Sequence, residues 1–338
     1  MQADPAAESF KAIVRAKTRG GLDLPVIDVT HPRFRVPDDP GSLKAQRDAF
    51  IAWDHHRRDV PKWITQFMLG LAVKRSRLMR AMFQSDTGFL DSISTYILKL
   101  GEKDLPPGVD GPFDRMIARS PHVVLVRLRM QQIAGLLAGA LVEPLASDTA
   151  APLHFINIAG GPALDSMNAV IVLNRGRPEL LQRPIVIDVL DAQDDGPWFG
   201  ANALAALQGP GGALRGLGIE FLHRSYDWND PTKLRALVAD LMSRGAIMAA
   251  SSEGGLFEYG TDQAIVANLK ALHAGVKIVA GSVTSSSEMR KRMIAETRFR
   301  LYPRGIEGFA PLAAQAGYAV AESKSAVLSE QVLLRPLG

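Results

Sequence analysis

Asn157-Ile158-Ala159-Gly160-Gly161-Pro162-Ala163 joins a short apolar run, residues 153–159, to a stretch with helical period at 162–174. In a parallel sheet, ligands bind at the carboxyl ends of the strands. A turn of small residues at that place lets a ligand approach the backbone N–H groups. Glycine used for turn geometry alone is the alternative. The position of the turn, on the first strand of an alternating pattern, favours a ligand.

Outward from this turn, apolar runs and amphipathic stretches alternate to residue 282. The alternation predicts a mostly parallel sheet with helices on both faces, an α/β fold. Residues 318–322 and 327–335 indicate two further strands, which must pair antiparallel because only four residues join them. The predicted strands are 153–159, 184–190, 219–224, 246–251 and 277–282, and the predicted helices are 162–174, 197–207, 231–244 and 261–274.

The part of the chain before this alternation has a different character. Stretches with helical period occur at 43–58, 62–83, 87–101 and 123–145, residues 104–112 form a loop, and no strand signal is convincing. We therefore divide the 338 residues into a mainly helical region, 1–148, and an α/β domain, 149–338.

The composition excludes several classes of site. There is no cysteine, which removes disulfides, thiolate nucleophiles and cysteine-held zinc or iron–sulfur clusters. The histidines have no metal-ligand spacing, so no metal is expected. A net charge of +4 is too small to indicate nucleic acid, and the basic runs at 74–77 and 290–292 are typical of solvated helix faces. No apolar run approaches the roughly 20 residues of a membrane span, so we expect a cytoplasmic protein with no membrane partner.

Polar residues stand at the ends of the later predicted strands. An acid after the second strand can accept hydrogen bonds from both hydroxyls of a ribose. Asp188 and Asp191 both qualify, with Asp188 slightly favoured. After the third strand, Asp227 beside Tyr226 and Trp228 suits an adenine ring, although Trp228 in the core is the alternative.

These residues together resemble a class I S-adenosylmethionine-dependent methyltransferase over residues 149–338. The Gly-x-Gly-x-Gly motif of that family, with its leading acid, stands here as Asn157, Ala159, Gly161 and Ala163. The resemblance implies a Rossmann-like, seven-stranded, mostly parallel sheet with a terminal antiparallel strand. It also implies S-adenosylmethionine as cofactor, bound by Asn157, Ala159, Gly160, Gly161, Asp188, Asp191, Tyr226, Asp227, Trp228 and Ser252.

Two departures from the family pattern stand out. Asn157 replaces the acid of the motif and brings no charge to the methionine ammonium group. The gap from Gly161 to Asp188 is longer than usual, which predicts a lengthened loop or an extra turn. Residues 252–259 are also similar to the Glu-Gly-Leu-Leu-x-Tyr stretch of leucine carboxyl methyltransferase relatives, with one residue inserted.

The expected activity is in-line methyl transfer to an oxygen or nitrogen of a small molecule, with the helical region as lid, acceptor pocket and possible homodimer contact. Glu253 is the first candidate for a base or substrate contact, followed by Tyr259 and by Arg304, which could pair with an acidic substrate. Arg127 and Arg129 could reach the cofactor carboxylate. An NAD(P)-dependent oxidoreductase and a non-catalytic S-adenosylmethionine-binding protein are the alternatives, although Gly-x-Gly-x-x-Gly spacing is missing.

Overall fold

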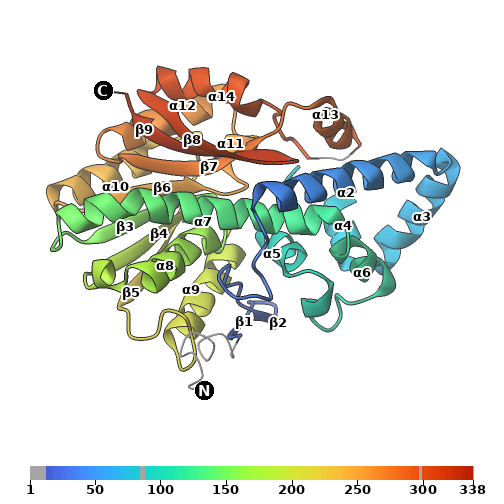
Figure 1. Cartoon of the computed structure of the whole chain (residues 1–338), viewed down its shortest axis with the longest axis horizontal. Helices are drawn as coiled ribbons and strands as arrows, with labels where there is room; N and C mark the ends of the chain where they lie inside the picture. The colour runs from blue at the N-terminus through green and yellow to red at the C-terminus, as the bar shows by residue number, and fades with distance from the viewer. Residues whose placement is uncertain (1–12, 84–87, 297–298, 338) are drawn as a thin grey trace.

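The computed structural model describes residues 13–83, 88–296 and 299–337. A seven-stranded sheet with the order β5-β4-β3-β6-β7-β9-β8 forms its centre (Figure 1). The strands β3 to β7 are parallel to one another. Their bounds are β3 Leu153–Ile158, β4 Ile185–Asp191, β5 Ile219–Ser225, β6 Ile247–Ser252, β7 Ile278–Thr284, β8 Tyr318–Ala326 and β9 Ser329–Pro336.

The strand β9 is the antiparallel member of the sheet. It comes last along the chain but lies between β7 and β8, and it pairs antiparallel with both. The hairpin turn is tight, with Ala326 opposite Ser329. The predicted fold class, a mostly parallel sheet of seven strands with a terminal antiparallel strand, is confirmed.

Helices cover both faces of the sheet. One face carries α7 (Pro121–Ser147), α8 (Leu164–Gly176) and α9 (Asp195–Gln208), which bury Phe155 and Ile187 in one core cluster. The other face carries α10 (Thr232–Ser243), α12 (Asp262–His273) and α14 (Gly305–Gln315), which bury Ile156 and Leu190 in a second cluster. Successive strand residues face opposite clusters because side chains alternate along a strand.

The helical region holds α2 (Pro40–Asp59), α3 (Lys62–Arg75), α4 (Arg77–Phe83), α5 (Ser92–Leu100), the 3-10 turn η1 (Glu102–Asp104) and α6 (Pro112–Ala118). The predicted helix 62–83 is two helices, separated at Ser76, whose hydroxyl donates to the buried Asp114. The predicted helix 87–101 is described only from residue 88 and is helical from Ser92. Gly101 ends it with a positive φ of 80°.

Several short elements, η1 and α6 among them, escape the sequence patterns. The hairpin of β1 (Arg15–Lys17) and β2 (Asp23–Pro25) has strands of three residues, too short to show alternation. The helices α11 (Leu256–Tyr259) and α13 (Glu288–Ala295) are also new. The 3-10 turn η2 (Pro178–Leu181) accounts for the long gap between Gly161 and Asp188, as the sequence predicted.

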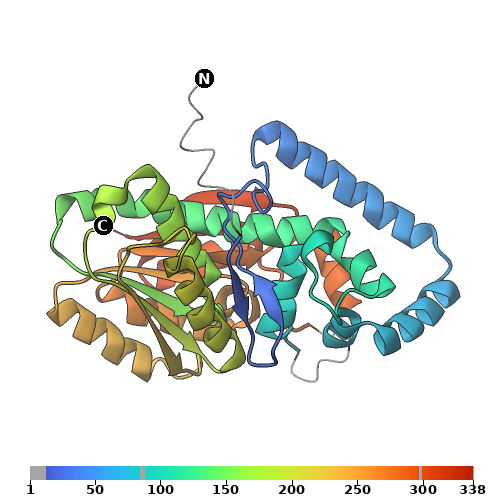
Figure 2. The same cartoon turned by 90° about the horizontal axis from the view of Figure 1, so that it is seen from below.

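The helix α7 precedes the division at residue 148 yet packs on the sheet (Figures 1 and 2). Over the described residues, it is the one helix long and apolar enough to cross a membrane, and 61% of its most apolar window is buried inside the protein. A single core cluster contains Leu24, Tyr96, Leu137 and Phe155. The helical region and the α/β domain therefore share a core.

Candidate active site

The turn after β3 keeps a glycine-type backbone although two of its residues are alanine. Ala159 has a φ of 54° and Ala163 one of 53°, and between them Gly161 has 57°. These alanines are the two non-glycine residues with positive φ in the described part of the chain. A left-handed backbone costs a residue with a Cβ roughly 1–2 kcal/mol. The surrounding structure therefore holds this turn in shape against its own preference.

Asn157 lies fully buried beneath the turn. Its Nδ2 donates to Asp165 Oδ1 at 2.8 Å, and it lies 3.0 Å from the hydroxyl of Ser251. The Oδ1 of Asn157 is buried without a partner and faces Gly160, where a Cβ would come within 2.2 Å of it. Only glycine fits at position 160 while Asn157 holds this rotamer.

Asp191, and not Asp188, lies at the turn. The Oδ2 of Asp191 accepts from the backbone N of Gly161 at 3.0 Å, and its Oδ1 accepts from Gln193 N at 2.8 Å. Burial raises the pKa of Asp191 against these hydrogen bonds, which lower it. Since each carboxylate oxygen has two acceptor sites, both can still accept a further hydrogen bond.

Asp188 lies three residues earlier and therefore on the opposite face of β4. Its Oδ2 is 3.0 Å from Nδ1 of His154, and its Oδ1 accepts from Arg224 Nη2 at 2.9 Å. The geometry does not favour Asp188 over Asp191 for a ribose, because strand parity turns the Asp188 carboxylate away from the glycine turn.

The residues after β5 divide between core and solvent. Tyr226 is buried and its hydroxyl donates to Asn268 Oδ1. Asp227 is exposed and accepts from the backbone N of Asn229 at 2.9 Å. Trp228 is half-buried beside the second core cluster, and its ring centroid is 6.0 Å from that of Phe89. Asp227 and Trp228 thus remain reachable from the edge of the sheet, whereas Tyr226 is part of the core.

A buried charge cluster lies at the end of β6. Glu253 accepts from Lys99 Nζ on α5 and from Arg129 Nε on α7 at 2.6 Å. The Nη1 of Arg129 also donates to Glu258 Oε1 at 3.1 Å. All four side chains are almost fully buried. This cluster therefore joins the helical region to the α/β domain by charge.

The cluster fixes the protonation of the two first catalytic candidates. Burial raises the pKa of Glu253, but Arg129 and Lys99 outweigh burial and the net shift is downward. Burial raises the pKa of Tyr259, and Glu258 adds to the rise. At neutral pH, Glu253 is a weakly basic carboxylate and Tyr259 a neutral phenol.

Two other predicted residues have local partners. Arg304 does not face the site, because its Nη2 donates to Gly260 O and to Asp262 Oδ1, each at 2.7 Å. Its role as a substrate contact is not supported, since the guanidinium clamps the loop before α12. The hydroxyl of Ser252 accepts from the backbone N of Leu256 and so begins α11.

The helix α5 covers the turn. A Cβ on Gly161 would come within 2.7 Å of the Cβ of Ser92, and one on Gly196 within 2.5 Å of its hydroxyl. Just before α5, Phe89 packs on Tyr259 with ring centroids 4.8 Å apart. We call residues 88–100 the α5 lid. It contacts the glycine turn at one end and Glu253 through Lys99 at the other.

Several residues of this edge were not predicted. Lys99 carries a signal in hindsight, since it is the only charge in the apolar helix Ser92–Leu100. Arg290 on α13 carries none: its Nε is buried without a hydrogen-bond partner. Burial lowers the pKa of Arg290, and the charge of Glu258 opposes this. Asp165 also has an unpartnered buried oxygen, and burial raises its pKa.

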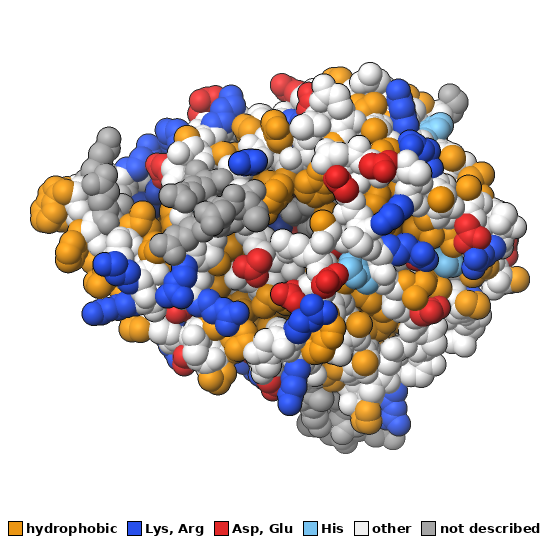
Figure 3. Space-filling model, turned by 180° about the vertical axis from the view of Figure 1, so that it is seen from behind, with side chains coloured by type: hydrophobic (Ala, Val, Ile, Leu, Met, Phe, Trp, Pro, Cys, Tyr) orange, Lys and Arg blue, Asp and Glu red, His pale blue; other side chains and the backbone are white. Residues whose placement is uncertain are grey.

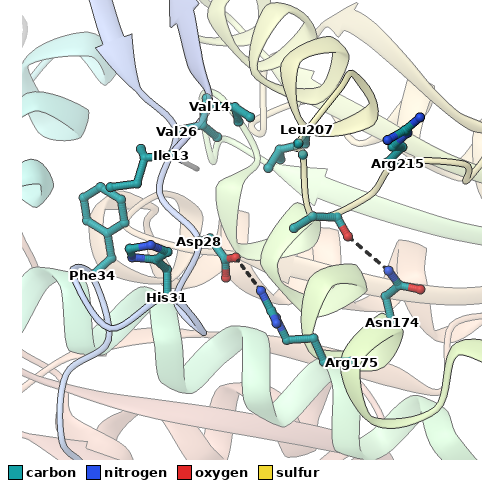
Figure 4. A pocket seen from close by; sticks show the side chains of 13 residues that line it. Ile13, Val14, Val26, Asp28, His31, Phe34, Asn174, Arg175, Leu207 and Arg215 are labelled. Atoms are coloured by element: carbon teal, nitrogen blue, oxygen red, sulfur yellow. Dashed lines mark hydrogen bonds and ion pairs between the residues drawn. The ribbon is translucent and has the colours of Figure 1, made fainter. Parts of the chain in front are cut away.

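A pocket of about 530 Å³ lies elsewhere, between the β1–β2 hairpin and the helices α8 and α9 (Figure 4). Its polar walls bond to one another: Arg175 Nη2 donates to Asp28 Oδ2 at 3.3 Å, and Asn174 Nδ2 donates to Ala213 O at 3.0 Å. None of the predicted site residues lines this pocket.

No protein-family model and no curated protein sequence matches the chain. Solved structures match in part. The magnesium protoporphyrin IX methyltransferase of Synechocystis PCC 6803, with bound S-adenosylhomocysteine, is 14% identical, with a TM-score of 0.43 over 64% of this chain and 87% of that one. An O-methyltransferase of neocarzinostatin biosynthesis is 16% identical, with a TM-score of 0.36 over 64% of this chain and 58% of that one.

An S-adenosylmethionine-dependent methyltransferase of Clostridium acetobutylicum is 8% identical, with a TM-score of 0.39 over 61% of this chain and 92% of that one. Similarity at these values assigns no activity. The function has to come from the residues of this chain.

Proposed function

We propose that the protein is an S-adenosylmethionine-dependent methyltransferase acting on a small molecule. The observation that carries this proposal is the turn of Ala159, Gly161 and Ala163, held in glycine geometry at the carboxyl end of β3, with Asp191 bonded to Gly161 N. Ligands of open α/β sheets bind at this edge. Strain kept at such a turn is typical of functional sites.

The residues present fit the cofactor. The unpartnered Oδ1 of Asn157 faces the turn, and Asp191 lies where it can accept from ribose hydroxyls. Asp227 and Trp228 are available to the adenine ring. Arg129 is a cation at the same edge of the sheet and can pair with the carboxylate of the cofactor. When bound, S-adenosylmethionine supplies a methyl group on a positively charged sulfur, which an acceptor attacks in line. Positioning and exclusion of water carry much of such a reaction.

The acceptor we propose is an oxygen that is already ionised, such as a carboxylate or an acidic phenol. Glu253 is held as a weakly basic carboxylate by two cations, and Tyr259 is a neutral phenol, so neither is a strong base. An ionised acceptor needs none. The unpartnered Nε of Arg290 offers a donor to such an anion. In this proposal, Glu253 orients Lys99 and Arg129 and does not take a proton.

The α5 lid gives the helical region, residues 1–148, a role in closing the site. Ser92 lies against Gly161 and Gly196, so the first turn of α5 must shift when a ligand enters over the turn. Closure then excludes water from the reacting atoms. We further propose that the protein is cytoplasmic. The homodimer remains a prediction, which a measurement of the sedimentation coefficient tests.

Calorimetric titration with S-adenosylmethionine, S-adenosylhomocysteine, NAD and NADP tests the cofactor. We expect the two adenosyl compounds to bind and the dinucleotides not to bind.

Asp191→Asn should weaken S-adenosylhomocysteine binding roughly 10- to 100-fold, which is the contribution of one or two hydrogen bonds to a charged group. Asp188→Asn is the control and should leave the affinity within about threefold. Binding of a dinucleotide alone would indicate an oxidoreductase. Tight cofactor binding without turnover on any ionised acceptor would indicate a non-catalytic protein.

A further inference from the structure

The helix α3 lies at one end of the molecule, at the corner that it forms with α2 (Figures 1 and 2). Its large apolar side chains are exposed. Trp63 is 71% exposed, Phe67 70% and Met68 42%. A contiguous exposed apolar patch on a soluble protein marks an interaction site. Trp63 and Phe67 are one helical turn apart and therefore lie on the same face.

Exposed cations follow the apolar residues directly. In the described part of the chain, no ion pair involves Lys74, Arg75, Arg77 or Arg80, and all four are exposed. Arg80 donates to the backbone oxygen of Lys74 at 3.2 Å, which keeps it beside the end of α3. By contrast, Arg57 and Arg58 on α2 pair with the buried Asp54. Among the described residues, no carboxylate thus neutralises the positive charge beside α3.

One of the four charges lies on the same face of α3 as Trp63 and Phe67. Lys74 is eleven residues after Trp63, which is close to three helical turns, so its side chain leaves α3 on the face of Trp63 and Phe67. The space-filling view shows hydrophobic side chains at this end of the molecule with Lys and Arg beside them (Figure 3). An aromatic face bordered by cations is the composition of helices that lie in the interface of a bilayer.

We propose that α3 docks the protein on an anionic lipid surface. Trp63, Phe67 and Met68 would enter the headgroup region while Lys74, Arg75, Arg77 and Arg80 contact lipid phosphates. In a two-fold symmetric dimer formed through α3, the four cations of one copy would lie beside those of the other. Their repulsion opposes such a dimer. The patch is also a projecting corner, which suits a deformable bilayer better than the complementary face of about 800 Å² that a protein partner needs. The proposal revises the expectation that no membrane takes part, and it does not depend on the proposed function.

Vesicle flotation of the full chain tests the proposal. Vesicles of phosphatidylcholine with 30% phosphatidylglycerol should bind the protein, and pure phosphatidylcholine vesicles should bind it weakly. Removing one cation near a lipid surface costs about fivefold in affinity. The variant K74Q/R75Q/R77Q/R80Q should therefore bind roughly 100-fold or more weakly, and salt should weaken the binding of the parent chain.

The variant W63S/F67S should also lose binding while keeping the unfolding transition of the parent, because both side chains are exposed. Trp198→Ser is the matched control, since Trp198 is 39% exposed on α9, away from the patch. We expect Trp198→Ser to bind like the parent. The proposal is wrong if anionic vesicles do not bind the chain, or if W63S/F67S and Trp198→Ser bind alike. It is also wrong if W63S/F67S abolishes a dimer seen by sedimentation, or if an oligonucleotide binds where vesicles do not.

Discussion

The helices α5 and α3 are both short and largely apolar, yet the apolar side chains of α5 are buried and those of α3 are exposed. In α5, Tyr96 and Ile97 are fully buried, and the Tyr96 hydroxyl donates to Pro25 O at 2.6 Å. In α3, the aromatic side chains lie in solvent. The α5 lid uses its apolar face to close the edge of the sheet, and its charge, Lys99, is paired. The apolar face of α5 is therefore covered by the rest of the protein, next to the proposed site. The apolar face of α3 is exposed, and in our proposal a lipid surface covers it.

We expect the largest loss of stability when the ion pair between Lys99 of the α5 lid and Glu253 is removed. Glu253→Ala should lower the free energy of unfolding by about 3–5 kcal/mol, because Lys99 and Arg129 would remain buried without a counter-charge. Arg75→Ala on α3 should change it by less than about 0.5 kcal/mol. Urea denaturation measures both. Equal effects would show that the cluster is not the fixed end of the lid.

The next effect compares the apolar faces directly. Ile97→Ala on α5 should cost about 3 kcal/mol, because its side chain is fully buried and leaves a cavity. Phe67→Ala on α3 removes a larger side chain but should cost less than about 0.5 kcal/mol in the absence of vesicles. Thermal unfolding of both variants checks the contrast. A large loss for Phe67→Ala would mean that α3 is covered in solution.

A pH titration tests the packing between α2 and the start of α7. Burial, together with the charges of Arg290 and Arg57, lowers the pKa of His122 to about 4. The imidazole lies against Phe50 and Trp53, with ring centroids 4.9 and 4.7 Å away. Since the folded pKa lies below the ordinary value, His122 contributes stability above pH 6.5 that is lost as the pH falls towards 4.

At pH 5 this loss should reach about 2 kcal/mol relative to pH 7. His122→Phe should remove that part of the pH dependence while the carboxylates still titrate. The difference between parent and variant stability, measured from pH 7 to 5, gives the contribution of His122 directly. A difference that does not change with pH contradicts a neutral, buried His122.

The smallest effect concerns the turn that α5 covers. Ala159→Gly should raise the free energy of unfolding by about 1 kcal/mol, because glycine adopts a φ of 54° without strain. The same change at the exposed Ala52 of α2 should lower it by about 1 kcal/mol, because glycine weakens a regular helix. Two changes of the same kind should thus have opposite signs.

The sheet could be predicted from sequence because each of its strands, and each of the longer helices between them, shows its own local period. The β1–β2 hairpin could not, since three residues show no alternation. Which of the two carboxylates lies at the glycine turn depends on the face of β4 from which each side chain projects. The sequence does not fix that face, so it could not decide between Asp188 and Asp191. The cluster of Lys99, Arg129 and Glu253 joins residues more than 120 positions apart, and no local pattern encodes that pairing.

Arg304 shows the reverse error. Its position in a loop after Pro303 suggested a substrate contact, but its donors are taken by Gly260 and Asp262, which lie 44 and 42 residues earlier. Glu253 was correctly expected at the end of a strand on this edge. Its reduced basicity could not be inferred, because that depends on two cations from the helical region.

The place of β9 has a consequence for biosynthesis. β7 and β8 both precede it along the chain and do not pair with each other, since β9 lies between them. During synthesis the nascent chain therefore carries an open edge on β7, and on β8, until β9 emerges. Unpaired strand edges are the usual starting point for association between unfinished chains. For this protein, the edge of β7 stays open for longest, from the translation of β7 until that of β9, and in this interval a chaperone has most to protect.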